Sequence, residues 1–498
     1  MSNRFPDTPT FTGLNRPCRI EGQINDLEYD STLPAGLRGT YYRSGPDPRF
    51  APLLGDDINI NGDGMVTMFR FGDGFVNFGS RYVRTEKYLL ESAAHRSLFG
   101  MYRNPYTSDP SVAGRDATTA NTNAFFHAGR LFALKEDGLP HELDPHSLET
   151  LGRHNFNGRL QSLTCTAHPK LDPATGELLS HGYEARGLAT RDISLQFISP
   201  QGALVREEFL QAPYPSFMHD WAATAQHVIF PVTPTTADDA RMRRGGAHWM
   251  FQCDLDAFFG ILRRDAPVRD IRWFRVPNCS LGHVLNAFND GDEVYVDIHV
   301  SERNQFPFIE NSDGSAFAGD KAVPRLTRFK FDLADPADRF TAEVLYADFM
   351  EMPIVDARYA LHPYRRGFAA ILDRSRPLNT MGTIGFGWNT LASLDLATRG
   401  IRRFYVGDNN TTGEPCFVPR SPDAPEGDGY LLAALTCYAH TPHTRIIVLD
   451  TQDIEQGPIS TIFMPLRLHG AVHGNWVPES ALSPPESAPR YPNRSTHS

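Results

Sequence analysis

Four histidines, far apart in the chain, share a local setting in which an imidazole can bind a metal ion. Each lies at the end of a short apolar segment or in a turn, and imidazole is a ligand that suits iron, zinc and copper. One such histidine alone is more often a structural residue. Four of them at the same phase of a repeat instead indicate one shared metal site, formed by His168, His219, His283 and His473.

Three glutamates are suited to support such a site. A histidine that binds a metal normally donates its other ring N–H to a carboxylate or carbonyl, which fixes its tautomer and raises its basicity. Four neutral imidazoles leave the metal ion its full charge, so carboxylates behind them would compensate it. Glu136, Glu351 and Glu414 stand close to glycine or proline in otherwise apolar runs, which is unusual for surface charges.

A loose internal repeat brings these residues to one phase. A short apolar strand ends at an aspartate, a turn follows, and a second strand leads to a histidine or glutamate after 19 to 27 residues. Repeated sheets around an axis form a β-propeller, whose innermost strands line the central channel. The repeat therefore predicts side chains that converge on this axis. The pairs are Asp144 with His168, Asp256 with His283, Asp332 with Glu351, Asp395 with Glu414 and Asp450 with His473, and a variant that begins at Ser199 leads to His219.

Short β-type segments dominate the rest of the chain, separated by turn residues that include 40 glycines and 38 prolines. This pattern is typical of many short strands, so we predict an all-β protein. Two segments, Thr85–Leu98 and Asp254–Leu262, are predicted to be helical. The clearest strand segments are Phe125–Ala133, Val228–Pro231, Glu293–Val300, Thr327–Phe331 and Arg445–Leu449.

The composition of the 498-residue chain excludes several classes of protein. A formal net charge of −11 argues against binding to nucleic acid or to an anionic membrane surface. The sequence shows no secretory leader, and no apolar stretch approaches the roughly 18 residues that span a membrane. Six scattered cysteines without a C-x-x-C spacing suggest reduced thiols. We therefore expect a cytoplasmic protein.

The sequence resembles the carotenoid cleavage oxygenase family, and within it the lignostilbene (stilbene-cleaving) dioxygenases. The resemblance extends from Asn61-Gly-Asp-Gly-Met65 to His473-Gly-Asn-Trp-Val-Pro478. It implies a seven-bladed β-propeller with a helical and loop cap over an axial metal site. It also implies that the four histidines hold Fe(2+), that the three glutamates lie behind them, and that Thr122 lies near the open coordination position. We accordingly expect one catalytic domain over residues 1–480, with cap insertions, and a flexible Pro- and Ser-rich tail over residues 481–498.

Two residues carry the resemblance to the stilbene-cleaving enzymes. Lys135 stands where carotenoid-cleaving relatives usually have an uncharged residue, and Tyr102 matches a second phenol-binding residue. A lysine and a tyrosine in an apolar cleft can bind a 4-hydroxyl group, and burial lowers the pKa of a lysine so that it can share a proton. Ile60 departs from the pattern, because some stilbene-cleaving enzymes have an aromatic residue there that stacks on the substrate.

The resemblance implies a non-haem iron(II) dioxygenase that cleaves the central C=C bond of a 4-hydroxystilbene into two aromatic aldehydes. Its partners would be a small aromatic substrate and O₂, and a homodimer is left open. Two alternatives keep the fold and the metal, with an apocarotenoid or other polyene, or a phenylpropene such as isoeugenol, as the substrate. A third is a propeller without activity that binds a partner protein and holds no stoichiometric iron. A zinc hydrolase is disfavoured, because catalytic zinc usually has three protein ligands.

Other chemically suggestive residues are interpreted as structural. His469 precedes His473 by four residues and is the best false ligand, but the motif around His473 favours the latter. The segment from Phe258 to Leu262, followed by Arg263 and Arg264, could dip into a membrane, but a buried edge is favoured. The remaining histidines assigned to structural or surface roles are His127, His141, His248, His299, His440 and His443.

Overall fold

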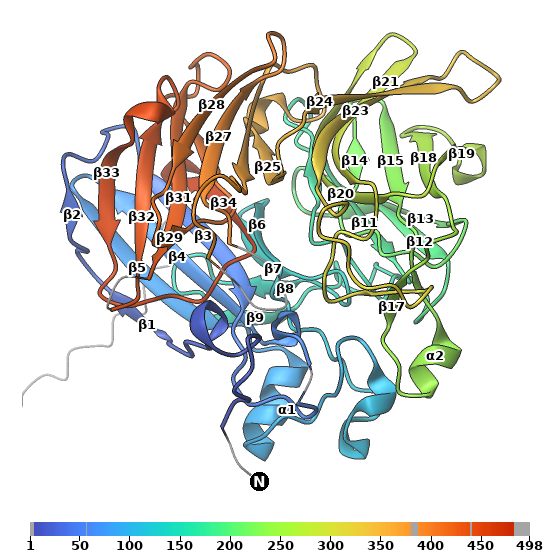
Figure 1. The fold of residues 1–498 in the computed structure, drawn as a ribbon, viewed down its shortest axis with the longest axis horizontal. Coiled ribbons are helices and arrows are strands. Elements are labelled where there is room, and N and C mark those ends of the chain that lie inside the picture. Colours follow the sequence, from blue (N-terminus) through green and yellow to red (C-terminus); the bar gives the residue numbers. More distant parts are fainter. Residues whose placement is uncertain (1–3, 56, 380–386, 439–440, 483–498) are drawn as a thin grey trace, which may run out of the picture.

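The computed structural model describes residues 4–55, 57–379, 387–438 and 441–482. Within them, seven antiparallel sheets surround a central axis as the blades of a β-propeller (Figure 1). The prediction of an all-β, seven-bladed propeller is therefore confirmed. Most of the predicted tail, from residue 483 onward, and His440 lie outside the described residues.

Blades 2 to 6 are each built from four strands, ordered here from the axis outward. Blade 2 contains β6 (Asn123–His127), β7 (Arg130–Leu134), β8 (His141–Leu143) and β9 (Thr150–Arg153). Blade 3 contains β10 (Lys170–Leu171), β11 (Leu178–Tyr183), β12 (Asp192–Ile198) and β13 (Leu204–Gln211). Blade 4 contains β14 (Ala222–Ala223), β15 (His227–Val232), β18 (Ala257–Arg263) and β19 (Arg272–Val276). Blade 5 contains β20 (Ser280–Asp290), β21 (Glu293–Ser301), β23 (Arg325–Asp332) and β24 (Phe340–Tyr346). Blade 6 contains β25 (Met350–Val355), β26 (Arg366–Ile371), β27 (Thr390–Asp395) and β28 (Gly400–Tyr405).

Blades 1 and 7 close the ring by sharing the two ends of the chain. Blade 1 contains β34 (His473–Pro478), β3 (Gly39–Pro46), β4 (Gly64–Gly72), β5 (Phe75–Tyr82) and β1 (Gly22–Ile24). Blade 7 contains β29 (Asn410–Thr411) and β30 (Cys416–Pro419), which both pair with β31 (Gly429–Cys437), then β32 (His443–Asp450), β33 (Pro458–Phe463) and β2 (Tyr29–Asp30). The last strand, β34, thus lies beside the N-terminal strand β3, and β2 forms the outer edge of the last blade.

The innermost strands pack against one another around the axis. β34 lies beside β6 and β30, and β20 lies beside β14 and β25. Between the blades, apolar side chains of alternating strand positions form continuous cores, for example Phe69 and Phe71 against Ile446 and Val448. These cores hold the ring in place, so the start of each inner strand has a defined position.

The aspartates of the sequence repeat are turn residues. At four of them, Asp144, Asp332, Asp395 and Asp450, the carboxylate follows the third strand of a blade and accepts backbone N–H groups of the next turn. An aspartate is favoured there because its short side chain replaces a backbone acceptor. Asp256 does not fit this pattern, because it precedes β18 instead of following it. The predicted pairing of Asp256 with His283 in the repeat is therefore wrong.

One of the two helical predictions is confirmed and the other is wrong. Thr85–Leu98 contains helix α1 (Glu86–Ala94), and the Thr85 side chain caps it by accepting the N–H of Tyr88. Asp254–Leu262 is not a helix, because its apolar part forms β18, which pairs with strands on both sides. A short apolar run cannot be assigned by periodicity alone. Phe259, Ile261 and Leu262 are buried inside the blade, so this segment does not form a membrane-dipping patch.

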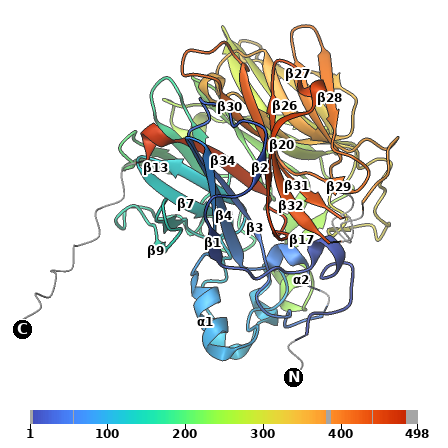
Figure 2. The ribbon, with the colours of Figure 1, turned by 90° about the vertical axis from the view of Figure 1, so that its left-hand side faces the viewer.

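The cap lies on one side of the propeller. Helices α1 and α2 (Asp239–Arg243) lie there together (Figures 1 and 2). A small additional sheet is formed by β16 (Thr235–Ala237), β17 (Trp249–Phe251) and β22 (Glu310–Asn311). None of the helices in the described part of the chain has the length and apolar character that crossing a bilayer requires.

Replacing Gly474 with alanine should weaken the pairing that closes the ring. A Cβ atom there would lie 2.5 Å from the carbonyl oxygen of Tyr42 on the paired strand β3. Such overpacking costs about 1–3 kcal/mol. We expect a lower free energy of unfolding for Gly474→Ala in urea titrations. Gly470→Ala is the control, since no heavy atom lies within 4 Å of its added Cβ, and equal stability of the two variants would contradict the prediction.

Candidate metal centre

Each of the seven blades presents one predicted site residue near the start of an inner strand. Thr122 directly precedes β6, His168 lies two residues before β10, His473 is the first residue of β34, and His283 is the fourth residue of β20. Side chains at equivalent positions around a propeller face the same point on its axis. In blade order from blade 1 to blade 7, the residues are His473, Thr122, His168, His219, His283, Glu351 and Glu414.

The structure brings the four histidines together. Their ligand nitrogens all lie within 4.8 Å of one another. The Nε2 atom of His219 lies 3.3 Å from Nε2 of His168 and 3.1 Å from Nε2 of His283. The ring of His473 lies edge-on to that of His168, with 4.4 Å between the ring centroids.

The three glutamates lie directly behind three of these histidines. Oε1 of Glu136 lies 2.5 Å from Nδ1 of His219, Oε2 of Glu351 lies 2.7 Å from Nδ1 of His283, and Oε1 of Glu414 lies 2.8 Å from Nδ1 of His473. Backbone N–H groups fix two of the carboxylates, since Met352 donates to Glu351 and Gly474 donates to Glu414. In the described part of the chain, no carboxylate forms such a pair with His168.

This arrangement fits a metal cation. When Nδ1–H donates to a carboxylate, Nε2 of the same ring carries a lone pair. The lone pairs of three rings therefore face one another, and Nε2 of His473 is buried with no hydrogen-bond partner. Buried acceptors that face each other need a shared positive charge. Four imidazoles without a carboxylate ligand suit iron, zinc or copper, so the donor set is compatible with iron.

The charges around the centre shift the pKa values of its residues. Burial alone would lower the pKa of His283, but the Glu351 carboxylate outweighs this effect and raises the pKa to about 9. Burial opposes ionisation of Glu351, yet the neighbouring His283 and His299 hold the pKa of its carboxyl group well below the usual range. Burial, together with the neighbouring His473 and His219, holds the pKa of His168 well below its ordinary value. His168 is thus kept neutral, as a metal ligand must be.

The sequence did not reveal three residues that join the ligand segments. The buried carboxylate of Asp220 accepts a hydrogen bond from Nζ of Lys170 at 2.7 Å and another from the backbone N–H of Val284 at 2.8 Å. The indole N–H of Trp221 donates to the carbonyl of His168 at 2.8 Å. The segments of His168, His219 and His283 are therefore cross-linked. The motif His219-Asp-Trp was the available signal, because a charged residue next to a ligand and a tryptophan is rarely exposed.

Lys135 and Tyr102, predicted as phenol-binding residues, also come together. Both side chains are largely enclosed, and Nζ of Lys135 lies 5.1 Å from the centre of the Tyr102 ring. Nζ donates to Thr119 at 2.8 Å and lies 3.4 Å from the carbonyl oxygen of Ile60. Ile60, predicted to line the substrate cleft, is thus adjacent to Lys135. Since Glu136 follows Lys135 in the chain, the pair of Lys135 and Tyr102 is connected to His219.

Asp137 modifies the expected role of Lys135. Its carboxylate lies 3.4 Å from Nζ of Lys135. Burial lowers the pKa of Lys135, and the charge of Asp137 opposes this effect. Burial raises the pKa of Tyr102 well above its ordinary range, so this hydroxyl is a hydrogen-bond donor and not an anion. The pair can therefore offer two donors to one oxygen atom.

A buried ion pair that the sequence did not reveal holds the backbone next to Tyr102. Arg103 donates to Glu184 at 2.5 Å and to the hydroxyl of Tyr183 at 2.8 Å. Nε2 of His248 lies 3.0 Å from the other oxygen of Glu184. The guanidinium group also lies over the ring of Trp249, 5.2 Å from its centre. The cap loop that carries Tyr102 is thereby anchored to blade 3 and to the additional sheet.

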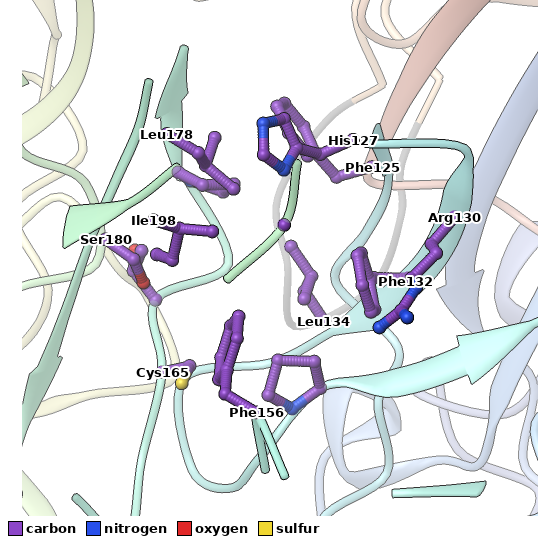
Figure 3. A pocket seen from close by; sticks show the side chains of 14 residues that line it. Phe125, His127, Arg130, Phe132, Leu134, Phe156, Cys165, Leu178, Ser180 and Ile198 are labelled. Atoms are coloured by element: carbon purple, nitrogen blue, oxygen red, sulfur yellow. The ribbon is translucent and has the colours of Figure 1, made fainter. Parts of the chain in front are cut away.

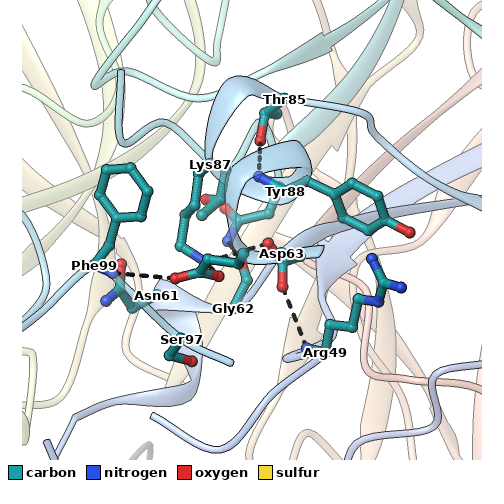
Figure 4. A network of polar contacts seen from close by, with 12 residues as sticks. Arg49, Asn61, Gly62, Asp63, Thr85, Lys87, Tyr88, Ser97 and Phe99 are labelled. Carbon is teal, nitrogen blue, oxygen red and sulfur yellow. Dashed lines mark hydrogen bonds and ion pairs between the residues drawn. The ribbon is translucent and has the colours of Figure 1, made fainter. Parts of the chain in front are cut away.

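A second buried network fixes the cap on the other side of Tyr102. Figure 4 shows Lys87 of α1 beside Asp63. Nζ of Lys87 lies 3.2 Å from a carboxylate oxygen of Asp63 and 2.8 Å from one of Glu91. Glu91 accepts the backbone N–H groups of Leu98 and Phe99. In the same region, Asp57 accepts the N–H of Tyr102 at 3.1 Å. Charged residues of the cap therefore position the backbone of Tyr102.

Among the residues that the structure describes, the other histidines do not join the metal centre. His469 is buried and packs against Gly45, and its nitrogens are not part of the four-histidine group. His299 lies behind Glu351, with 3.9 Å between Nδ1 and Oε2. His248 belongs to the Arg103 network, and His127 contacts the carbonyl of Gly176.

Comparisons with known proteins agree with this geometry. The family described as retinal pigment epithelial membrane protein matches residues 15–478. The chain is 43% identical to isoeugenol monooxygenase of Pseudomonas nitroreducens, over 96% of this chain and all of that protein. It is 41% identical to lignostilbene-alpha,beta-dioxygenase isozyme III of Sphingomonas paucimobilis, over 96% and 99% of the two chains. The crystal structure of Pseudomonas brassicacearum lignostilbene dioxygenase is 43% identical and superposes with a TM-score of 0.93, over 96% of this chain and all of that one.

Removal of His473 should abolish tight metal binding, whereas removal of His469 should not. Losing the hydrogen-bond partner of a metal ligand already weakens metal affinity by about 10- to 100-fold, and losing the ligand itself weakens it further. We expect His473→Ala to retain far less metal than the wild-type protein after dialysis, and His469→Ala to retain an equal amount. Elemental analysis of both purified variants checks this prediction. Equal metal content in His473→Ala and the wild type would show that His473 is not a ligand.

Glu184→Gln should destabilise the protein, because it leaves the buried charge of Arg103 without its counter-ion. Removing one partner of a buried ion pair costs about 3–5 kcal/mol. Glu343→Gln is the matched control, since Glu343 pairs with Arg399 at 2.9 Å on the exposed surface, where a pair contributes about 1 kcal/mol or less. Chemical denaturation measures both variants. Similar losses in the two would mean that the Arg103 network does not stabilise the cap.

Proposed function

The chain belongs to the carotenoid cleavage oxygenase family, which is the family described above as retinal pigment epithelial membrane protein, and we propose its substrate and its metal on this basis. The protein is a metal-dependent oxygenase that acts on a C=C bond. We propose that the metal is iron(II) and that the substrate is a phenol with a conjugated alkene para to its hydroxyl group. A 4-hydroxystilbene is the first candidate, cleaved at its central double bond into two aromatic aldehydes.

The observation that carries this proposal is the enclosed pair of Lys135 and Tyr102 in the segment that supports His219. Asp137 and the hydroxyl of Thr119 already partner the buried ammonium group of Lys135, and its positive charge can attract a further hydrogen-bond acceptor. A phenol oxygen supplies such an acceptor, and a hydrocarbon polyene does not. The pair therefore favours a phenolic substrate over an apocarotenoid.

The residues of this chain bind and activate the substrate as follows. The hydroxyl of Tyr102 and Nζ of Lys135 hold the phenol oxygen between them. The positive charge of Lys135 next to that oxygen favours its deprotonated form, and the proton passes to the adjacent carboxylate of Asp137. The negative charge is then delocalised through the ring to the alkene, which becomes more electron-rich. Iron(II), when bound by the four histidines, supplies the centre at which O₂ is activated.

The cleavage needs no further reductant. The alkene loses its C=C bond, O₂ loses its O–O bond, and each alkene carbon gains one oxygen atom as a carbonyl. Phe217 contributes an apolar wall, since its ring stacks on His219 at 5.5 Å and meets Phe306 at 5.7 Å. Such a wall limits the access of water to the reacting carbons.

A phenylpropene such as isoeugenol is the second candidate. Ile60 lies next to Lys135, and an aliphatic side chain there offers no stacking partner for an aromatic ring. A substrate with a single ring loses less from this difference than a stilbene does. The similarity to an isoeugenol monooxygenase points in the same direction.

One experiment tests the function as a whole. The iron-loaded protein is incubated in air and without O₂ with resveratrol, isoeugenol and a lignin-derived stilbene, and the products are separated by chromatography. We expect aromatic aldehydes from at least one phenol, only in air. Turnover without O₂, or no aldehyde from any of the three, would refute the proposal. A protein that holds no stoichiometric iron would favour a propeller without activity.

Lys135→Met should distinguish phenols from their methyl ethers. The variant loses a charge-assisted hydrogen bond to the phenol oxygen, which contributes about 1.5–3 kcal/mol, or about 10- to 100-fold in kcat/KM. We expect this loss for a 4-hydroxystilbene and little change for the slower 4-methoxystilbene. Lys330→Met is the control, because Lys330 forms a surface pair with Glu293 on blade 5. Equal losses for both substrates would indicate a general disturbance and not phenol recognition.

A further inference from the structure

We propose that an apolar cavity between blades 2 and 3 is a docking site for O₂ close to the metal centre, an inference that rests on the proposed function. The cavity has a volume of about 30 Å³ and lies apart from the phenol-binding pair. Figure 3 shows apolar side chains of both blades pointing into it. They are Phe125, Phe132, Leu134, Phe156, Leu178 and Ile198.

The size and the lining of the cavity select its ligand. A volume of about 30 Å³ accepts a molecule of one or a few atoms but not an aromatic ring. A water molecule stays in such a site only with two to four polar partners. Five polar side chains line the wall, including Arg130 and Ser180, and the other three are already engaged. The hydroxyl of Thr166 accepts the N–H of His168, Cys165 donates to Gln196, and Nε2 of His127 lies 3.3 Å from the carbonyl of Gly176. The cavity therefore favours a small apolar molecule.

The walls of the cavity belong to segments that also form the metal centre. Cys165, Thr166 and Pro169 line it and flank the ligand His168. On the opposite wall, the carbonyl of Leu134 accepts the N–H of Thr122 at 2.9 Å. Leu134 is followed directly by Lys135 and Glu136 in the chain. A molecule in the cavity is thus separated from the centre by the side chains and backbone of these two segments.

The other end of the cavity lies towards the surface. Arg130 and Gly202 belong to its wall, and Arg130 is exposed. The proposed reaction needs two substrates, and the organic one is proposed to bind at Lys135 and Tyr102. A separate site between the blades allows O₂ to reach the centre while the organic substrate is bound. Small movements of the side chains that separate the cavity from His168 would complete the passage.

Xenon tests the site without any turnover, because it occupies dry apolar cavities. Crystals of the wild-type protein are pressurised with xenon, and we expect one xenon atom among the six apolar side chains. Ile198→Phe and Leu178→Phe each fill the space, and two variants are used in case one does not fold. We expect no xenon in either variant. Absence of xenon from the wild-type cavity would overturn the proposal.

Kinetics then connect the cavity to the reaction. We expect the filling variants to raise the KM for O₂ by about 3- to 10-fold, with an unchanged KM for the phenol and an unchanged kcat at saturating O₂. Leu171→Phe is the control, since Leu171 lies on the neighbouring strand β10 but is exposed and outside the cavity. An unchanged KM for O₂ in a xenon-free variant would refute the role in O₂ delivery. If xenon binds but no phenol is cleaved, the proposed function fails and the gas site remains.

Discussion

Repulsion between buried imidazole lone pairs is the constraint on which the rest of the structure depends. Glu136, Glu351 and Glu414 fix the tautomers of three histidines and thereby direct their Nε2 atoms towards one point. Without a positive charge between them, the lone pairs of these atoms would repel one another. The ring of seven blades holds the strands that carry them at a fixed separation. The fold therefore preserves an arrangement that a metal ion makes favourable.

The substrate side of the centre depends on charges inside the cap. Tyr102 stands between two buried networks, one around Arg103 and Glu184 and the other around Lys87 and Asp63. Buried ion pairs add little net stability, but losing one partner is costly. They define one position of the cap loop more strictly than apolar packing would. The position of Tyr102 thus depends on charged residues of the cap that lie outside the metal centre.

The sequence predicted the features that depend on residue type and local spacing. The four histidines and three glutamates could be recognised because few other residue types suit their roles. Asp220, Arg103, Glu184 and His248 could not, because their partners are distant in the chain and meet only after the blades and the cap are assembled. The incorrect helix over Asp254–Leu262 has a related cause, since only pairing with both neighbouring strands makes that short apolar run a strand.

The pairing of β34 with β3 determines when the four histidines can come together. The last ligand, His473, is placed by the final strand of the chain, whereas its partner strand is among the first to be synthesised. The four histidines therefore form a complete set only after the strands of all seven blades have been synthesised. Closure of the ring by β34 and assembly of the four-histidine centre are thus one event, and a chain in which β34 has not yet paired offers three histidines instead of four.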